Sequence, residues 1–198
     1  YDDEAFNEER DAVLRSLAEH GIEAVVNVGA SIQTTKNTLE LMKKYPFVYG
    51  AVGVHPSETA ELNDHLFDWL RHVSEEEKVV AIGEIGLDLY WDKTFLREQL
   101  LAFEKQVEWA LEYHLPIVIH TREAFDYIYK VLQPYKETGL TGIFHSFTGT
   151  SEEAAKLLDF PGFMIGINGV VTFKKSQLPE VLKDVPLARI VLETDSPY

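Results

Sequence analysis

The sequence predicts an α/β protein with one parallel sheet, and three observations support this. Short apolar runs rich in β-branched residues recur along the 198 residues, as expected of strands buried on both faces. Between them lie longer segments with apolar residues at three- and four-residue spacing, which is typical of amphipathic helices. No linker, low-complexity tract or repeat divides the chain, so we expect a single domain over residues 1–198.

The predicted elements alternate from one end of the chain to the other. A helix over residues 2–19 comes first, and the His20-Gly21 step is its end signal. Ser151 is the expected N-cap of a later helix, because two acidic residues follow it. Seven strands are predicted, at residues 22–28, 47–54, 79–85, 116–120, 142–145, 163–167 and 189–193.

Strands that alternate with helices in this way form consecutive right-handed βαβ units, and the usual closed form has eight strands. The first helix precedes the first strand, and the sequence stops just past the last strand, at residues 196–198. We therefore expect a TIM (β/α)8 barrel that lacks its first strand and its last helix. An open doubly wound sheet is the alternative, but no Gly-rich dinucleotide turn follows any of these strands.

The composition excludes several classes of protein. With 18 basic and 33 acidic residues the formal charge is −15, and there is no cysteine, hence no disulfide, thiolate metal site or cysteine nucleophile. No apolar run reaches the roughly 18 residues of a membrane span. The start of the chain is acidic where a signal peptide would be basic, so we expect a cytoplasmic protein without membrane contact. The negative charge opposes nucleic-acid binding unless metal ions or a local cation offset it.

Ionisable residues lie at one end of five predicted strands: His55, Glu84, His120, His145 and Asp195. In a barrel these strand ends converge on the face where active sites are built. Each residue alone has a structural explanation, such as a hydrogen-bonded histidine or a helix cap. Five together favour a metal site, because divalent cations offset buried carboxylates. The nitrogen and oxygen donors suit zinc, manganese or magnesium.

The strand positions indicate a role for each of four residues. Glu84 has two oxygens and can bridge two metal ions, while His120 and His145 can ligate the same ion. Asp195 can bind a metal or accept a proton from metal-bound water. Two divalent ions lower the pKa of a bridging water towards roughly 7, so we expect hydrolysis of an ester.

Weaker signals come from the segments beside these residues. Arg122 can bind a phosphate oxygen or pair with Glu123 or Asp126. Asp88 can orient a metal ligand or cap the turn that follows it. The Tyr90-Trp91 step can stack a base at the rim of the site or pack as a lid.

Five motifs follow one another from residue 53 to residue 198. They are Gly53-Val54-His55-Pro56, Ile82-Gly83-Glu84-Ile85-Gly86-Leu87-Asp88, Ile119-His120-Thr121-Arg122-Glu123-Ala124, His145-Ser146-Phe147-Thr148-Gly149 and Glu193-Thr194-Asp195-Ser196-Pro197-Tyr198. In this order and at these intervals they resemble the TatD family of metal-dependent deoxyribonucleases, within the wider amidohydrolase-like barrels.

The resemblance implies a barrel whose two-metal centre hydrolyses phosphodiester bonds of DNA, often as an exonuclease. It implies that Glu84 bridges the metals, that His120 and His145 ligate one ion, and that Asp195 is the ligand and base on the other. His55 is similar to a family residue that contacts the substrate phosphate. We assign Arg122 and Asp88 to substrate binding as well. The family also has an Asp-x-His-x-His motif on its first strand, and the 198 residues do not contain it.

Two other functions stay open at this point. A barrel amidohydrolase or lactonase would use the same metal chemistry on a small ester or amide, although no lysine at a mid-barrel strand end is available to bridge its metals. A catalytically silent scaffold would have no need of the four metal-binding side chains. For the DNA hydrolase we expect weak, salt-sensitive DNA binding. No heptad seam or long apolar stripe calls for an obligate protein partner.

Overall fold

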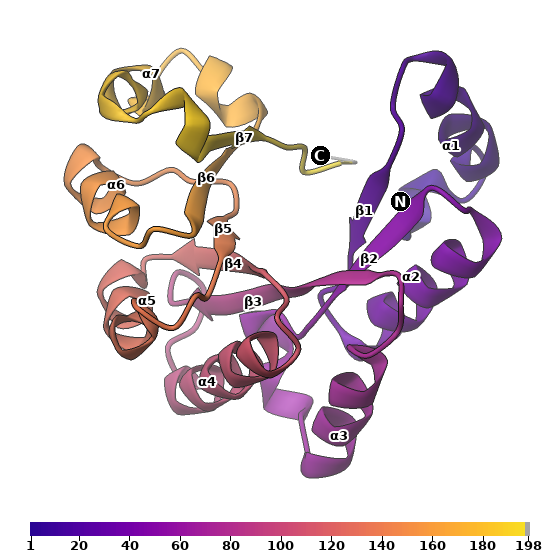
Figure 1. Ribbon diagram of the computed structural model, residues 1–198, viewed down its shortest axis with the longest axis horizontal. Coiled ribbons are helices and arrows are strands. Elements are labelled where there is room, and N and C mark those ends of the chain that lie inside the picture. Colours follow the sequence, from indigo (N-terminus) through magenta and orange to yellow (C-terminus); the bar gives the residue numbers. More distant parts are fainter. Residues whose placement is uncertain (197–198) are drawn as a thin grey trace.

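Seven parallel strands form one curved sheet in the computed structural model, which describes residues 1–196 (Figure 1). Their order in the sheet is their order in the sequence, from β1 to β7. The strands are β1 (Val25–Val28), β2 (Val48–Val52), β3 (Val79–Asp88), β4 (Ile117–Arg122), β5 (Gly142–Phe144), β6 (Phe163–Ile167) and β7 (Ile190–Leu192). The seven predicted strands are confirmed, and β3 and β4 run further than expected, to Asp88 and Arg122.

Helices lie on the outer side of the curved sheet (Figure 1). They are α1 (Arg10–Glu19), α2 (Ile32–Lys44), α3 (Asp64–Val73), α4 (Leu96–Glu112), α5 (Phe125–Leu132), α6 (Ser151–Leu158) and α7 (Leu178–Val181). β1 and β7 stand on either side of an opening, and within residues 1–196 each pairs with one strand alone. Side chains at these edges are exposed, Val26 by 48% and Leu192 by 87%. The arrangement is that of the predicted barrel, open between its first and last observed strands.

The first predicted helix is wrong in extent. Residues 2–19 form a short 3-10 turn over Glu4–Phe6 and then α1, which begins at Arg10. The Arg10 guanidinium donates hydrogen bonds of 2.7 and 2.9 Å to the carbonyl oxygens of Tyr1 and Asp3. These bonds fold the start of the chain back and separate it from the helix.

The cap of α6 is also displaced by one residue from its predicted position. Thr150, and not Ser151, is the N-cap. The Thr150 hydroxyl accepts from the Glu153 N–H at 3.2 Å, and the Glu153 carboxylate accepts from the Thr150 N–H at 2.7 Å. This reciprocal pair is a capping box, which satisfies two backbone donors at once.

Most side chains of the central strands are buried, and the alternate residues Val80, Val118 and Ile143 are half-buried. Ile82, Ile117, Ile119 and Phe144 have no exposed surface, and Phe103 of α4 belongs to the same core. Burial of each such side chain contributes roughly 1.5–3 kcal/mol. The carboxyl ends of β3, β4 and β5 are therefore held by the most densely packed part of the protein.

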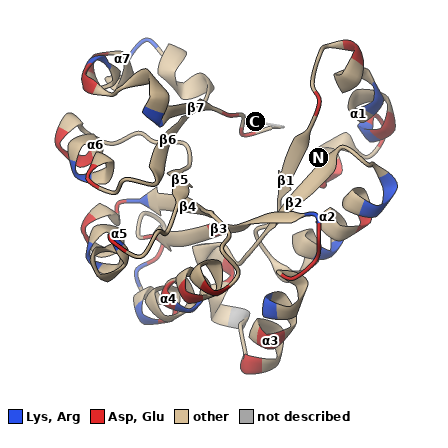
Figure 2. Cartoon of the chain, in the orientation of Figure 1, with Lys and Arg blue, Asp and Glu red and all other residues tan. Residues whose placement is uncertain are grey.

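Charged side chains of both signs alternate over the outer helices, while the central strands carry few of them (Figure 2). The last two residues of the fifth sequence motif, Pro197 and Tyr198, lie outside the described residues. Among the helices described, none combines the length and the apolar character needed to cross a membrane.

Candidate metal centre

A bulge in β3 sets the position of Glu84. The pairing with β4 passes from Ile82 opposite Ile117 to Ile85 opposite Ile119, so β3 has one residue more than its partner over this stretch. Bulges bend a strand and redirect the side chains beside them. Glu84 lies in this bulge, and its carboxylate faces the histidines at the ends of β4 and β5.

Gly86 allows the two strands to approach each other beside Glu84. Its φ is +138°, and a Cβ at this position would lie 2.0 Å from the carbonyl oxygen of His120. Only glycine fits such a position, because a side chain would overlap the neighbouring backbone. The Glu-Ile-Gly sequence thereby brings the side chains of Glu84 and His120 together.

Carboxylates and histidines alternate through the centre of the site. His120 has its Nε2 3.0 Å from Asp88 Oδ2 and its Nδ1 3.1 Å from Glu84 Oε1. His145 has its Nε2 4.0 Å from the same Glu84 oxygen and 3.4 Å from Asp195 Oδ1. The four predicted metal-binding side chains and Asp88 therefore form one connected series, in the order Asp88, His120, Glu84, His145, Asp195.

Glu193 belongs to this series, and the sequence analysis missed it. One of its oxygens lies 2.7 Å from His145 Nδ1, and the other accepts a hydrogen bond from the Ser146 N–H. The signal for it is the Glu-x-Asp spacing directly after β7, which places a second carboxylate, that of Glu193, two residues before Asp195. His145 is thus held between two carboxylates of the same strand end.

The hydrogen bonds to carboxylates raise the pKa of two histidines. Burial lowers the pKa of His145, but the bonds to Asp195 and Glu193 outweigh it and raise the pKa to about 10. His120 behaves alike, since Glu84 raises its pKa against the effect of burial. Burial raises the pKa of Glu84 in turn, yet the bond from His120 outweighs this and leaves it below the usual value. The hydrogen bond with His145 likewise lowers the pKa of Asp195, so Glu84 and Asp195 stay ionised at pH 7.

His55 lies against His120 but has different partners. The two rings meet edge to face with their centres 4.3 Å apart. His55 Nδ1 accepts from the Ser57 N–H at 3.2 Å, so the neutral ring carries its proton on Nε2. Burial lowers the pKa of His55 to about 4, which keeps the ring neutral at pH 7.

Two buried glutamines of α4 fix the backbone behind the site. The Gln99 amide accepts from the Asp88 N–H at 3.0 Å and donates to the Asp88 carbonyl at 3.1 Å. The Gln106 amide accepts from the N–H of Val54, the neighbour of His55, at 2.8 Å. Seven residues are two helical turns, so both side chains lie on one face of α4. The sequence analysis missed both of them.

Asp88 performs both of the tasks considered for it. Its Oδ1 accepts from the Tyr90 N–H at 3.0 Å and closes the turn after β3. Its Oδ2 faces His120, as described above. Since both oxygens are engaged, Asp88 orients His120 and shapes the loop with one side chain.

Arg122 does not form the ion pairs considered for it. Within residues 1–196 its guanidinium has no carboxylate partner, and it lies over the Tyr90 ring at 4.0 Å and near the Trp91 ring at 5.5 Å. It borders a central cavity of about 480 Å³, which is also lined by the predicted site residues other than Asp88: His55, Glu84, His120, His145 and Asp195. The positive charge is therefore available to a bound anion.

The donor set fits a divalent cation. Ligand atoms of His55, Glu84 and His120 lie within 4.8 Å of one another. In the described part of the chain, the ion-pair partners of Glu84 and Asp195 are histidines, with no lysine or arginine among them. Carboxylates and imidazoles with no lysine or arginine among them are a donor set to which zinc, manganese or magnesium binds, and the histidines give up their protons on binding the metal.

Known proteins resemble this chain over nearly its whole length. A family model described as TatD related DNase matches residues 1–198. The uncharacterized metal-dependent hydrolase YabD of Bacillus subtilis (strain 168) is 35% identical over 196 residues, which are 98% of this chain and 76% of YabD. The 3'-5' ssDNA/RNA exonuclease TatD of Salmonella typhimurium is 31% identical over 195 residues, or 98% of this chain and 75% of that protein.

A solved structure has the same fold. The crystal structure of YjjV, a TatD homologue from Escherichia coli K12, matches with a TM-score of 0.89 at 29% identity, over 98% of this chain and 75% of YjjV. The predicted barrel arrangement and the resemblance drawn from the motifs are both confirmed. The chain belongs to the TatD-related DNase family of metal-dependent hydrolases.

Proposed function

We propose that the protein is a single-domain hydrolase that cleaves phosphodiester bonds of DNA from a strand end, with two divalent metal ions. The observation that carries the proposal is the position of Glu84, one oxygen of which lies 3.1 Å from His120 and 4.0 Å from His145. A carboxylate between two imidazoles is suited to share cations between two sites. The TatD exonuclease of Salmonella typhimurium, a relative by sequence, supports the substrate class.

Glu84, His120, His145 and Asp195 would hold the two ions, which are magnesium, manganese or zinc. Bound there, the ions would lower the pKa of a water molecule and neutralise charge on the phosphate. The protein itself binds and orients the substrate. Asp195, at the open side of the cavity, is suited to accept a proton from the attacking water at a carboxylate oxygen.

A ligand atom of His55 lies within 4.8 Å of those of Glu84 and His120, and in this proposal His55 uses this position to bind the substrate phosphate and not a metal. Its Nδ1 is engaged by Ser57, so Nε2 carries the proton and can donate it in a hydrogen bond to a phosphate oxygen. Arg122 supplies the positive charge beside it. Asp88, which the sequence assigned to substrate binding, acts through His120, since both of its oxygens are engaged.

The formal charge of −15 makes DNA binding weak and salt-sensitive in this proposal. An enzyme that grips only the end of a strand needs few phosphate contacts. The acidic side chains on the outer helices repel the rest of the strand (Figure 2). No obligate protein partner is required, and the cytoplasm stays the predicted location.

The test is cleavage of an end-labelled single-stranded DNA in Mg²⁺ or Mn²⁺, with EDTA and Glu84→Ala as controls. Glu98→Ala is the matched variant, because Glu98 is an exposed acid in the first turn of α4. We expect a ladder of shortened products that EDTA and Glu84→Ala abolish and Glu98→Ala leaves unchanged.

Two results would contradict the proposal. Metal bound at stoichiometric levels without DNA cleavage would move the substrate to a small ester or amide. DNA binding that persists in molar salt would contradict the weak, end-limited contact derived from the charge.

A further inference from the structure

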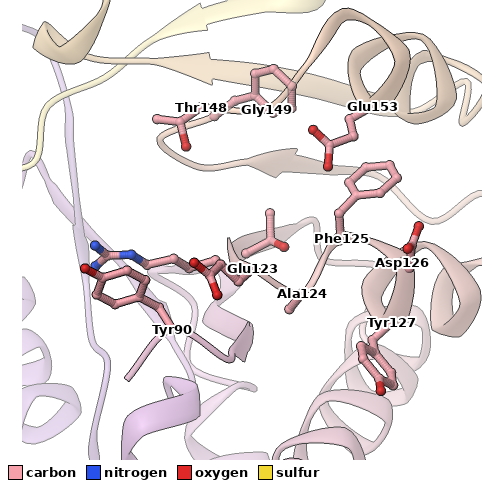
Figure 3. A pocket seen from close by; sticks show the side chains of 12 residues that line it. Tyr90, Glu123, Ala124, Phe125, Asp126, Tyr127, Thr148, Gly149 and Glu153 are labelled. Atoms are coloured by element: carbon pink, nitrogen blue, oxygen red, sulfur yellow. The ribbon is translucent and has the colours of Figure 1, made fainter. Parts of the chain in front are cut away.

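A second cavity, of about 550 Å³, adjoins the central one (Figure 3). Thr121, Arg122 and Thr148 border both cavities. A volume of this size is within the range of small-molecule pockets. A ligand with its phosphate in the central cavity can therefore extend into the second one without leaving the surface.

The walls of the second cavity suit a flat ring. Tyr90 and Glu123 lie on one side in Figure 3 and Phe125 and Glu153 on the other, with Gly149 above the space between them. Aromatic walls bind planar groups by stacking, and each nucleobase offers such a face. Four aromatic residues border this cavity: Tyr90, Phe125, Tyr127 and Phe147.

Arg122 adds a second flat surface. The Tyr90 ring lies 4.0 Å from the centre of its guanidinium, and within residues 1–196 that guanidinium donates no hydrogen bond. A ring stacked on one face of a guanidinium holds its plane and leaves the opposite face for a ligand. Bases of single strands stack on arginine in this way. Tyr90 is therefore a positioning residue that prepares Arg122 as a stacking surface.

The charges at this cavity distinguish a base from a phosphate. Its lining contains three carboxylates, those of Glu123, Asp126 and Glu153, and one cation, Arg122. One oxygen of Glu153 accepts a hydrogen bond from the Thr150 N–H. The other oxygen of Glu153 and the carboxylates of Glu123 and Asp126 have no hydrogen-bond donor among residues 1–196. Carboxylates repel a phosphate and accept hydrogen bonds from amino groups.

We propose that this cavity binds the base of a nucleotide adjoining the cleaved phosphate, and that it favours a base with an exocyclic amino group. The inference rests on the proposed function and adds a base preference to it. Adenine, cytosine and guanine carry such a group, whereas thymine does not. The base is held between Arg122 and the aromatic walls, and its amino group donates to Glu123.

The test compares dinucleotides that have an intact base or an abasic sugar at each position in turn. A base-free chromogenic phosphodiester measures the reaction without any base contact. We expect loss of the base at one of the two positions to lower kcat/KM by about tenfold or more, since stacking on aromatic side chains has this magnitude. Thymine at that position is expected to be cleaved more slowly than adenine or cytosine.

Matched variants assign the effect to the cavity. Tyr90→Ala lowers the ratio of dinucleotide to base-free cleavage, while Tyr90→Phe restores it because the ring remains. Arg122→Lys keeps the positive charge but removes the planar guanidinium, so it also lowers the ratio of dinucleotide to base-free cleavage. Glu123→Gln is expected to reduce the difference in kcat/KM between adenine and thymine substrates. The loss of kcat/KM on removal of the base is expected to stay, because the stacking surfaces are unchanged.

The outcomes separate this inference from the proposed function. Cleavage of the base-free diester together with equal cleavage of intact and abasic dinucleotides would overturn the base pocket and preserve the phosphodiesterase. A base effect that persists in Tyr90→Ala and Arg122→Lys would place the base elsewhere and overturn it as well. No cleavage of any diester in Mg²⁺ or Mn²⁺ would overturn both.

Discussion

The candidate site is built from two regions of unequal burial, the interior strands β3 to β5 and the strand β7 beside the opening. β3 has ten residues and is buried along most of its length, whereas β7 has three residues and ends at the exposed Leu192. The Glu84 side chain is 18% exposed, and that of Asp195 is 59% exposed. The packed interior therefore supplies the buried carboxylate of Glu84, and the edge of the sheet supplies the more exposed carboxylate of Asp195.

Each region nevertheless supplies a carboxylate that contacts a histidine of the interior strands in the same way. Asp88 contacts His120 with one oxygen and a backbone N–H with the other. Glu193 likewise contacts His145 with one oxygen and accepts a hydrogen bond from the Ser146 N–H with the other. Orientation of a histidine by a carboxylate therefore depends on local hydrogen bonds and not on the length of the strand that carries it.

The largest expected effect separates Glu84 from Asp195. Glu84→Gln keeps the shape of the side chain and removes its charge, and we expect kcat/KM for a base-free phosphodiester to fall at least about 1,000-fold. Asp195→Asn is expected to cost about 100-fold, because its half-exposed side chain contacts one histidine. Steady-state kinetics with metal content by elemental analysis measure both. A greater loss of kcat/KM in Asp195→Asn than in Glu84→Gln would show that catalysis depends more on the carboxylate at the edge of the sheet than on the one in its interior.

The same comparison applies to stability. Phe144 in β5 has no exposed surface, so Phe144→Ala is expected to lower the free energy of unfolding by about 3–5 kcal/mol. Leu192→Ala in β7 is expected to change it by less than about 0.5 kcal/mol. Urea unfolding followed by circular dichroism measures both, and Phe144→Leu serves if the alanine variant does not fold. Equal costs would mean that β7 is as tightly packed as β5.

Sequence predicts the interior region better than the contacts that complete the site. Apolar runs identify all seven strands because each strand is rich in β-branched and other apolar residues, including the partly exposed edge strands β1 and β7. The first helix is wrong in extent because Arg10 binds the carbonyl groups of Tyr1 and Asp3 through its side chain, a contact that the apolar spacing does not encode. Gln99 and Gln106 are missed because a buried amide in a helix has the same sequence pattern as an exposed one. The contact of Glu193 with His145 joins β7 to β5 and depends on register.

The next effect tests the equivalence of the two orienting carboxylates. We expect Asp88→Asn and Glu193→Gln each to lower metal affinity or kcat/KM by about 10- to 100-fold. In each variant a neutral amide replaces the charged carboxylate that contacts the histidine. Isothermal titration with Mn²⁺ and steady-state kinetics measure the two effects. A loss in Asp88→Asn alone would show that the packed interior is the sole source of orientation.

The smallest expected effect lies beside the opening, where α1 is attached to α2 by exposed charges. Asp11 of α1 accepts hydrogen bonds from Lys44 at 2.7 Å and from the hydroxyl of Tyr45. The bond from Lys44, followed by that from Tyr45, lowers the pKa of Asp11 below its ordinary value of 3.8. A carboxyl group with a lowered pKa in the folded state stabilises the fold above its unfolded pKa, and this stabilisation is lost as the pH falls through the folded pKa. Asp11→Asn is therefore expected to be slightly less stable than the parent at pH 7 and equal to it at about pH 2, in thermal unfolding followed by circular dichroism. A difference of the same size at both pH values would assign the contact to hydrogen bonding alone, and the attachment of α1 would then be independent of charge.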